Sequence, residues 1–314
     1  MKRFVLVLMV VGMAMSMSSC EKDNYNSGRY NGQSGSQTGD NNNHGGGSSV
    51  GGFDSNGASN ALFSVSPTKK VRFSRGNLQY NTITGIWRFA PNQYDFARIE
   101  GDDLRYISSD GWMDLFGFGT SGWNSGANAY LPTSTSDKKQ DYYVGGSYTN
   151  DLTGTYANAD WGVYNSISNG GNRTRIWRTP TADEWNYLIS DEGPRAGRWA
   201  LATIDGKYSG MIILPDEWTT PSGLYILAGG GSWTRNVFTI NEWKKLEASG
   251  AIFLPQCGWR SSSVRVMGNG KYWSVNHKDD SYIMCLSFSD NIDAFVSSIN
   301  YRFRGFSVRL IQDK

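Results

Sequence analysis

The stretch "GKYWSVNHKDDSYIMCLSFSDNIDAFVSSINYRFRGFSVRLI" (Gly270–Ile311) decides the fold of this chain. Tyr272 and Trp273 near its start and the run Gly305–Leu310 near its end carry the aromatic and β-branched residues that are typical of strands. Between them lies a mixture of Asn, Asp, Ser, Tyr, His and Phe without a repeating pattern. We therefore expect a rigid β frame that holds an irregular set of side chains between its strands.

Two segments upstream carry the same helix signal, Thr179–Asp191 and Thr239–Gly250. In each, a threonine is followed three residues later by a glutamate, which predicts a capping box at the helix start, and a Trp and a Leu then line one face. An apolar strand-forming segment follows each predicted helix, Gly210–Trp218 and Gly250–Arg260. Residues 101–175 are rich in Gly, Asn, Trp and Tyr and poor in periodicity, which predicts long ordered loops pinned by aromatic side chains. The predicted fold class is α+β, with small twisted antiparallel sheets, two helices and long ordered loops.

The charge balance and the histidine count argue against several functions. The net charge is +2 and no Lys/Arg block stands out, so nucleic-acid binding has no electrostatic basis. The chain has two histidines, His44 and His277, and no three or four His/Cys residues at the spacing of a zinc site, and His277 alone could serve a nucleophilic triad. We expect no metal, no cofactor and no catalytic residue. Cys257 and Cys285 are left open between a disulfide and two buried free thiols.

The N-terminus predicts export. Lys2 and Arg3 precede an apolar run, Phe4–Met17, that is shorter than the roughly 20 residues a bilayer-spanning helix needs. Small residues then lead to Cys20, and this junction resembles a bacterial lipobox, which implies a signal peptide over 1–19 and lipid on Cys20. The alternative is an ordinary signal peptide with an incidental cysteine. The resemblance predicts an outer-membrane lipoprotein, displayed at the cell surface and held to the membrane by its lipid anchor only.

The composition beyond the leader predicts two parts. Residues 20–60 are mostly Gly, Ser and Asn, which indicates a flexible linker because such a segment has almost nothing to bury. Residues 61–314 are predicted to form one domain.

Several quoted motifs together resemble a known family. They are "RGNLQY" (75–80), "WRFAPNQYDF" (87–96), "WGVYNSISNGGN" (161–172), "WRTPTADEW" (177–185), "FLPQCGWR" (253–260), "GNGKYWSVN" (268–276), "CLSFS" (285–289) and "NYRFRGFSVRLI" (300–311). Over most of 61–314 the chain resembles gut-bacterial surface lipoproteins of the C-type-lectin-like assemblage, related to the fibrobacter-type major paralogous domain. The variable proteins of diversity-generating retroelements are the best-studied kin of that group.

The resemblance implies a C-type-lectin-like fold in which the last strand pairs with the first. In retroelement-linked members, adenine-directed mutagenesis diversifies codons near the C-terminus, and the residue types between Asn276 and Phe303 are those that such mutagenesis produces from Asn codons. The alternative is that these are ordinary loop residues. This sequence differs from the related proteins in two ways, which limit the functions that the resemblance implies. The calcium motifs of sugar-binding lectins are absent, and Cys257 and Cys285 lie outside any motif of the formylglycine-generating enzymes that share the fold.

We therefore predict a surface-displayed, non-enzymatic recognition protein, monomeric, that binds a protein or glycan ligand on a host or microbial surface. The alternatives are a formylglycine-generating-enzyme-like or other cell-envelope enzyme, or a structural surface component. The predicted ligand-binding residues are Ser261, Ser263, Arg265, Asn276, His277, Asp279, Tyr282, Asn291, Asp293, Phe295, Asn300, Tyr301 and Phe303. Tyr282, Phe295, Tyr301 and Phe303 are expected to act as aromatic anchors, because such side chains offer large rigid contact area at low entropic cost.

Overall fold

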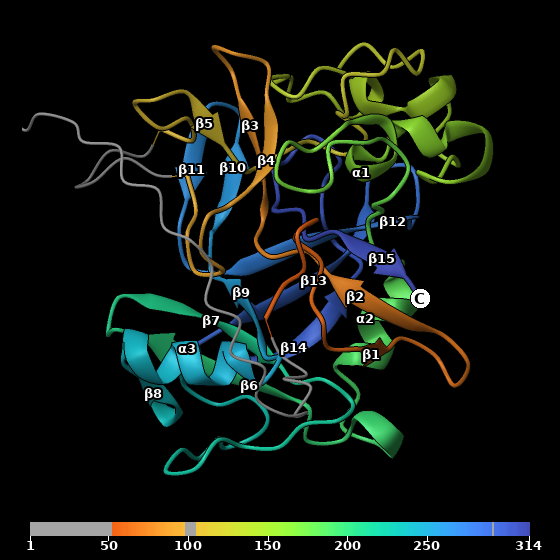
Figure 1. Cartoon of the computed structure of the whole chain (residues 1–314). Coiled ribbons are helices and arrows are strands. Elements are labelled where there is room, and N and C mark those ends of the chain that lie inside the picture. The colour runs from red at the N-terminus through yellow and green to blue at the C-terminus, as the bar shows by residue number, and fades with distance from the viewer. Residues whose placement is uncertain (1–51, 98–104, 291) are drawn as a thin grey trace, which may run out of the picture. The chain divides into compact units, whose positions relative to one another are not determined.

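The structure is a computed structural model that describes residues 52–97, 105–290 and 292–314 (Figure 1). The predicted signal peptide, Cys20, the first part of the predicted linker and Asn291 lie outside these residues. The described residues form short helices and several small sheets whose pairings are antiparallel with one exception. The predicted α+β class is therefore confirmed. No helix in the described ranges combines the length and the apolar character that crossing a membrane requires.

The two predicted helices begin where their capping boxes place them. The Thr181 hydroxyl, just before α2 (Ala182–Leu188), accepts a hydrogen bond from the backbone N–H of Glu184, whose carboxylate accepts one from the backbone N–H of Thr181. α3 (Ile240–Ala248) repeats this arrangement with its own threonine and glutamate. Ser249 is the C-cap of α3, and Gly250 follows it in the left-handed region, at a φ of 99°, where glycine commonly ends a helix.

Helix α3 packs against a four-stranded sheet. Its spatial order is β8 (Val237–Phe238), β6 (Trp199–Ile204), β7 (Tyr208–Ile213) and β9 (Ile252–Pro255). The β6–β8 pair is parallel and the other two pairs are antiparallel. The buried side chains of Trp243 and Leu246 on α3 share a core cluster with Phe253 of β9.

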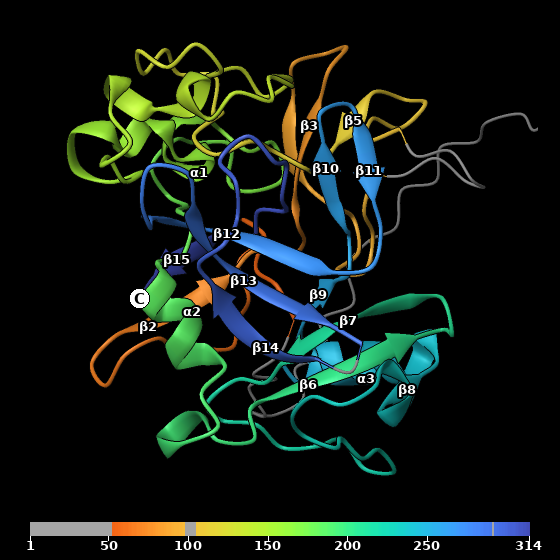
Figure 2. The same cartoon turned by 180° about the vertical axis from the view of Figure 1, so that it is seen from behind.

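The C-terminal stretch forms a second sheet, which crosses the centre of the view in Figure 2. It consists of β12 (Gly270–His277), β13 (Ile283–Ser289) and β14 (Ile292–Ser297), in that order and antiparallel throughout. Helix α2 packs against it, and the indole of Trp185 donates a hydrogen bond to the carbonyl of Trp273 at 3.1 Å.

A third sheet joins the two ends of the described chain. β15 (Ile311–Asp313) pairs antiparallel with β2 (Lys70–Phe73), which also pairs with β1 (Phe63–Ser64). The resemblance implied a last strand paired with the first. In the structure the last strand pairs with the second, because β2 occupies the middle of the sheet.

Two further small sheets lie beside the C-terminal sheet (Figures 1 and 2). One has the order β4 (Trp87–Phe89), β3 (Leu78–Asn81) and β5 (Trp112–Met113). The other is the hairpin of β10 (Trp259–Ser261) and β11 (Val264–Val266).

Residues 105–175 are ordered loops, as predicted. The side chains of Phe116, Phe118, Tyr142 and Trp161 in this region are at most 1% exposed, so aromatic burial fixes the backbone where regular pairing is sparse. Its helical pieces are short and comprise η1 (Lys139–Tyr142), η2 (Val144–Gly146), η3 (Gly154–Ala159) and α1 (Trp161–Tyr164). Two more 3₁₀ turns lie later in the chain, η4 (Gly193–Arg195) and η5 (Trp233–Arg235).

The predicted domain start at residue 61 is too late. Ala58 is fully buried and forms a bridge with Ser74, and Asp54 makes an ion pair with Arg72 at 2.8 Å. The Asp54 carboxylate also accepts backbone hydrogen bonds from two following residues, which forms a tight turn. The small polar residues that indicated a linker are also the residues that tight turns use, so composition could not separate the two.

Candidate functional site

The frame residues of the C-terminal stretch are buried, as the sequence predicts. Tyr272, Trp273, Leu286 and Phe288 are at most 1% exposed. The Tyr272 hydroxyl donates to the carbonyl of Pro255 at 2.7 Å, and the Trp273 indole donates to the carbonyl of Phe116 at 2.7 Å. The two frame aromatics that carry a polar group, Tyr272 and Trp273, are thus fixed both by packing and by a hydrogen bond.

Three predicted anchors gather at one place, which we call the aromatic ledge: Tyr282, Tyr301 and Phe303. The ring centroids of Tyr282 and Tyr301 are 5.0 Å apart, and those of Tyr301 and Phe303 are also 5.0 Å apart with the rings nearly parallel. All three side chains are partly exposed. A β-bridge between Tyr282 and Tyr301 fixes their backbones side by side, so the ledge is built into the fold.

Arg304 extends the ledge toward the β10–β11 hairpin. Its guanidinium carbon lies 4.1 Å from the ring centroid of Trp259 and 5.1 Å from that of Tyr301. Because strand residues two apart point to the same face, Ser261 lies on the same face of β10 as Trp259. Sequence reasoning did not assign Trp259 and Arg304 to the site. The sequence could have indicated both, because Trp259 lies two residues before the predicted Ser261 and Arg304 directly follows the predicted Phe303.

A buried arginine holds the turn beneath the ledge. Arg302 is fully buried and donates to the carbonyls of Tyr148 and Asp279 at 2.7 Å each and to that of Asp280 at 3.1 Å. Desolvation lowers the pKa of Arg302, and the nearby phenol and carboxylates oppose this effect. Asp279 adds an Asx turn, because its carboxylate accepts the backbone N–H of Tyr282 at 3.0 Å. The turn that carries Tyr282 is therefore held from both sides.

Two predicted contact residues serve to anchor a strand end. Asp151 accepts a hydrogen bond from the backbone N–H of His277 at 2.7 Å and lies 2.6 Å from its Nδ1 atom. The amide of Asn276 donates to the other Asp151 oxygen at 3.0 Å and accepts the backbone N–H of Ala182 at 2.9 Å. Asn276 and His277 are half-buried, and these bonds tie the end of β12 to helix α2 and to the loop of Asp151.

The remaining predicted residues lie on separate surfaces. Ser263 is exposed at the turn of the β10–β11 hairpin. Asp293 and Phe295 point outward from β14, where Phe295 is 46% exposed. Lys271 connects this strand face to the ledge. Its Nζ atom donates to Asn300, the residue before Tyr301, at 2.8 Å. The same atom lies 3.4 Å from the hydroxyl of Ser287, which pairs with Phe295 across β13 and β14. Asn291 lies outside the described residues.

Two predicted contact residues must be corrected. Arg265 is 2% exposed and makes an ion pair with the buried Asp114 at 2.7 Å. Asn300 is 1% exposed, and its amide donates to the carbonyl of Ser297 at 3.0 Å. Both side chains satisfy buried polar groups and cannot reach a ligand. Sequence reasoning failed here because arginine and asparagine are usually exposed, and the partners that reveal their burial are distant in sequence, Asp114 for Arg265 and Lys271 for Asn300.

Neither cysteine has the chemistry of a nucleophile. Cys257 and Cys285 are free thiols with fully buried side chains, so the alternative of two buried thiols is the one the structure shows. Burial raises the pKa of each thiol to about 12, which keeps both protonated near neutral pH. Within residues 52–97, 105–290 and 292–314, no three His, Cys, Asp or Glu side chains form a group suited to a metal ion.

Comparison with known proteins adds no relative. Neither the family models, nor the curated proteins, nor the solved structures contain a match to this chain.

Proposed function

We propose that this protein is a surface-displayed recognition protein with a C-type-lectin-like fold, and that the aromatic ledge with Trp259 and Arg304 forms the centre of its ligand-binding face. The ligand is a protein or glycan on a host or microbial surface, and the chain binds it as a monomer without catalysis. The export signal and Cys20 support display on a lipid anchor at the outer membrane.

The observation that carries the proposal is the contrast between the frame and the ledge. Trp273 is fully buried in the core, while Tyr282, Tyr301 and Phe303 remain partly exposed although burial would be favourable for each. Clustered aromatic side chains on a rigid support are what recognition surfaces use, because little conformational entropy is lost on binding. The cationic Arg304 adds directional hydrogen-bond donors to an otherwise apolar surface.

The neighbouring surface supports an extended partner. Ile299 is 71% exposed two residues before Tyr301, and Phe295 is 46% exposed on the edge strand β14. Exposed apolar side chains close to an aromatic cluster favour contact with a macromolecule over a free small solute. The Lys271 contacts place the outward face of β14 next to the backbone that leads into the ledge.

Other features support the finer fold assignment. The last strand pairs with a strand at the start of the domain, two capped helices flank small sheets, and long aromatic-pinned loops fill much of the chain. A retroelement that diversifies the C-terminal codons would leave a near-copy of them beside a reverse-transcriptase gene. Sequencing the flanking DNA tests that part of the proposal.

The binding test compares matched aromatic substitutions. The full-length protein is screened on a glycan array and against a panel of purified surface proteins, and each ligand found is titrated with Phe303→Ala and with Tyr225→Ala. Tyr225 is 73% exposed and distant in sequence from the ledge, so it controls for the loss of any surface aromatic. We expect Phe303→Ala to weaken binding by about tenfold or more and Tyr225→Ala to leave it unchanged. Equal affinities for the two variants would refute the ledge as the binding centre.

A further inference from the structure

A cavity of about 540 Å³ opens between the loop before α2 and the C-terminal strand. Val163 of α1 and Ile311 of β15 contribute apolar lining, and Asn56 and Gln312 contribute amides. Its charged lining residues are Arg173, Arg175, Arg178 and Asp313. The cavity is formed by residues other than those of the aromatic ledge.

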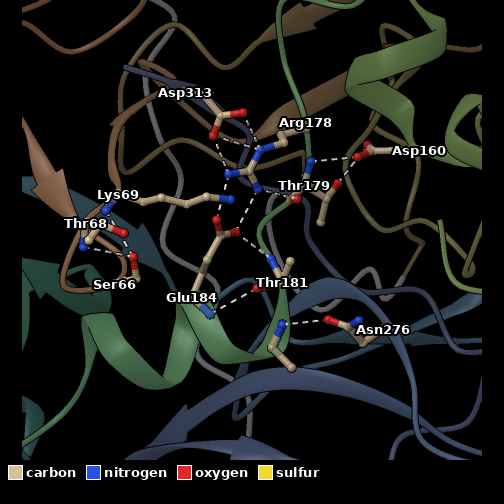
Figure 3. A network of polar contacts seen from close by, with 11 residues as sticks. Ser66, Thr68, Lys69, Asp160, Arg178, Thr179, Thr181, Glu184, Asn276 and Asp313 are labelled. Atoms are coloured by element: carbon tan, nitrogen blue, oxygen red, sulfur yellow. Dashed lines mark hydrogen bonds and ion pairs between the residues drawn. The ribbon is translucent and has the colours of Figure 1, made fainter. Parts of the chain in front are cut away.

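The charges in this lining are unbalanced. Arg178 is held by two carboxylates, since its guanidinium makes ion pairs with Glu184 at 2.6 Å and Asp313 at 2.5 Å (Figure 3). Among the residues that the structure describes, no carboxylate pairs with Arg173 or Arg175. Arg175 donates one hydrogen bond, to the side-chain oxygen of Asn158 at 3.1 Å. Two exposed guanidinium groups therefore face the cavity region with most of their donors unused.

The backbone of this loop adopts a conformation that L-residues seldom take. Arg175 has a φ of 62°, and Asn172 has a φ of 50°. Asparagine tolerates this region, whereas for arginine it costs about 1 kcal/mol. A hydrogen bond from the Arg175 backbone N–H to the carbonyl of Val163 at 3.1 Å fixes this conformation. Strain of this kind is retained mainly where side-chain placement matters, and here it fixes where the Arg175 side chain leaves the backbone.

The base of the cavity is rigid and offers no exposed aromatic platform. The Trp177 side chain is 1% exposed, and its indole donates to the carbonyl of Gly170 at 2.8 Å. A ligand here would consequently be recognised by charge and hydrogen bonding instead of by stacking. The volume suits a compound of one to two sugar rings.

We propose that this cavity binds an acidic saccharide, with the carboxylate of a uronate residue held by Arg173 and Arg175 and its hydroxyl groups near the amides of Asn56 and Gln312. A planar guanidinium matches a carboxylate in a two-point hydrogen-bonded pair, and two such groups in one lining favour an anion over a neutral sugar. The site is separate from the recognition face and does not depend on it.

The test uses titration calorimetry of the full-length protein with trigalacturonate, its fully esterified methyl ester and sodium sulfate. One or two rings of the trisaccharide would occupy the cavity, and the remainder would extend into solvent. We expect trigalacturonate to bind, the neutral ester not to bind, and added salt to weaken the interaction. The double variant Arg173→Ala/Arg175→Ala should raise the Kd by about tenfold or more. Lys244→Ala/Lys245→Ala removes the same charge from exposed positions on α3 and should leave the Kd unchanged.

The outcomes separate cleanly. Sulfate binding as tight as trigalacturonate binding would show a general anion site and overturn the saccharide assignment. Absence of trigalacturonate binding, or equal loss in both double variants, would overturn the site. Arg175→Gly guards against a folding artefact, since glycine accepts the local φ without strain and should keep the thermal stability while still weakening binding.

Discussion

The guanidinium of Arg265 and the carboxylate of Asp114 form an ion pair at 2.7 Å in which both side chains are almost completely buried. Asp114 also accepts the backbone N–H of Ala97 at 2.7 Å, and Arg265 donates to the carbonyls of Cys257 and Ala97. The pair thus joins the β10–β11 hairpin to two loops that are more than a hundred residues earlier in the chain. Removing either partner would leave the other as an unpaired buried ion, so the folded state depends on keeping both.

Removing Arg265 should therefore destabilise the fold. We expect Arg265→Ala to lower the free energy of unfolding by about 3–5 kcal/mol, because Asp114 stays buried without its partner. Urea denaturation measures this, with Lys244→Ala as the surface control. A loss no larger than that of the control would show that the arginine is free, as a contact residue would be.

The ledge can be divided into its rings and its hydroxyl groups. The Tyr282 and Tyr301 hydroxyls are 3.5 Å apart, so they contribute little to holding the rings together. Tyr301→Phe should keep ligand affinity within about threefold, whereas Tyr301→Ala should weaken it by about tenfold or more. Affinity measurements on both variants decide this, and an equal loss for Phe and Ala would assign the binding to the hydroxyl.

Asp160 should give the stability of the protein a distinct pH dependence. Burial raises the pKa of Asp160 to about 6, although its carboxylate accepts hydrogen bonds from Thr179 (Figure 3) and from the backbone N–H of Gly162. The folded state then binds a proton more tightly than the unfolded chain, so the free energy of unfolding contributed by this group falls as pH rises from about 4 to 6. The fall should amount to about 3 kcal/mol at most.

The control for this prediction is Asp160→Asn. The variant keeps one acceptor oxygen but places an NH2 group against the backbone N–H of either Thr179 or Gly162, so we expect lower stability at every pH, but a flatter profile between about pH 4 and 6. Urea unfolding at a series of pH values measures both. Profiles that run parallel for the two proteins would mean that Asp160 does not titrate in this window.

The two capping boxes provide a matched pair of glutamates. Glu184 is 6% exposed and accepts two hydrogen bonds from Arg178 at 2.6 and 2.7 Å, whereas Glu242 is engaged with Thr239 at the helix start. We expect Glu184→Gln to cost about 1.5–3 kcal/mol, because a charged partner is lost at a buried site. Glu242→Gln should cost clearly less. Thermal melts of both variants measure the difference, and similar melting temperatures would contradict a structural role for the Arg178 pair.

The cysteines offer a probe of the fold itself. With burial raising the pKa of both thiols to about 12, Cys257 and Cys285 should not react with a maleimide in the native protein at neutral pH. In a Cys20→Ser variant, both should react fully in urea. Mass spectrometry counts the adducts, and rapid native labelling of either residue would contradict its burial.

Local signals in the sequence determined the helices and the frame. A capping box needs only residues within one turn, so Thr181 and Thr239 fix the starts of α2 and α3 from neighbouring positions. The aromatic run around Tyr272 and Trp273 likewise predicted a buried strand, because large apolar side chains are stabilised by packing in a core. The sequence also named Tyr282, Tyr301 and Phe303 as aromatic side chains between strand segments, but their ring contacts depend on the tertiary structure.

The tertiary structure alone decided the rest. Arg265 and Asn300 look like surface residues in the sequence, and their burial depends on Asp114 and on the Lys271 ammonium group being brought to them by the fold. The pairing of β15 with β2 instead of β1, and the packing of Ala58 into the domain, depend on which distant segments meet. Sequence patterns report what each residue prefers among its neighbours along the chain, whereas burial of a charge or an amide is set by partners that only folding supplies.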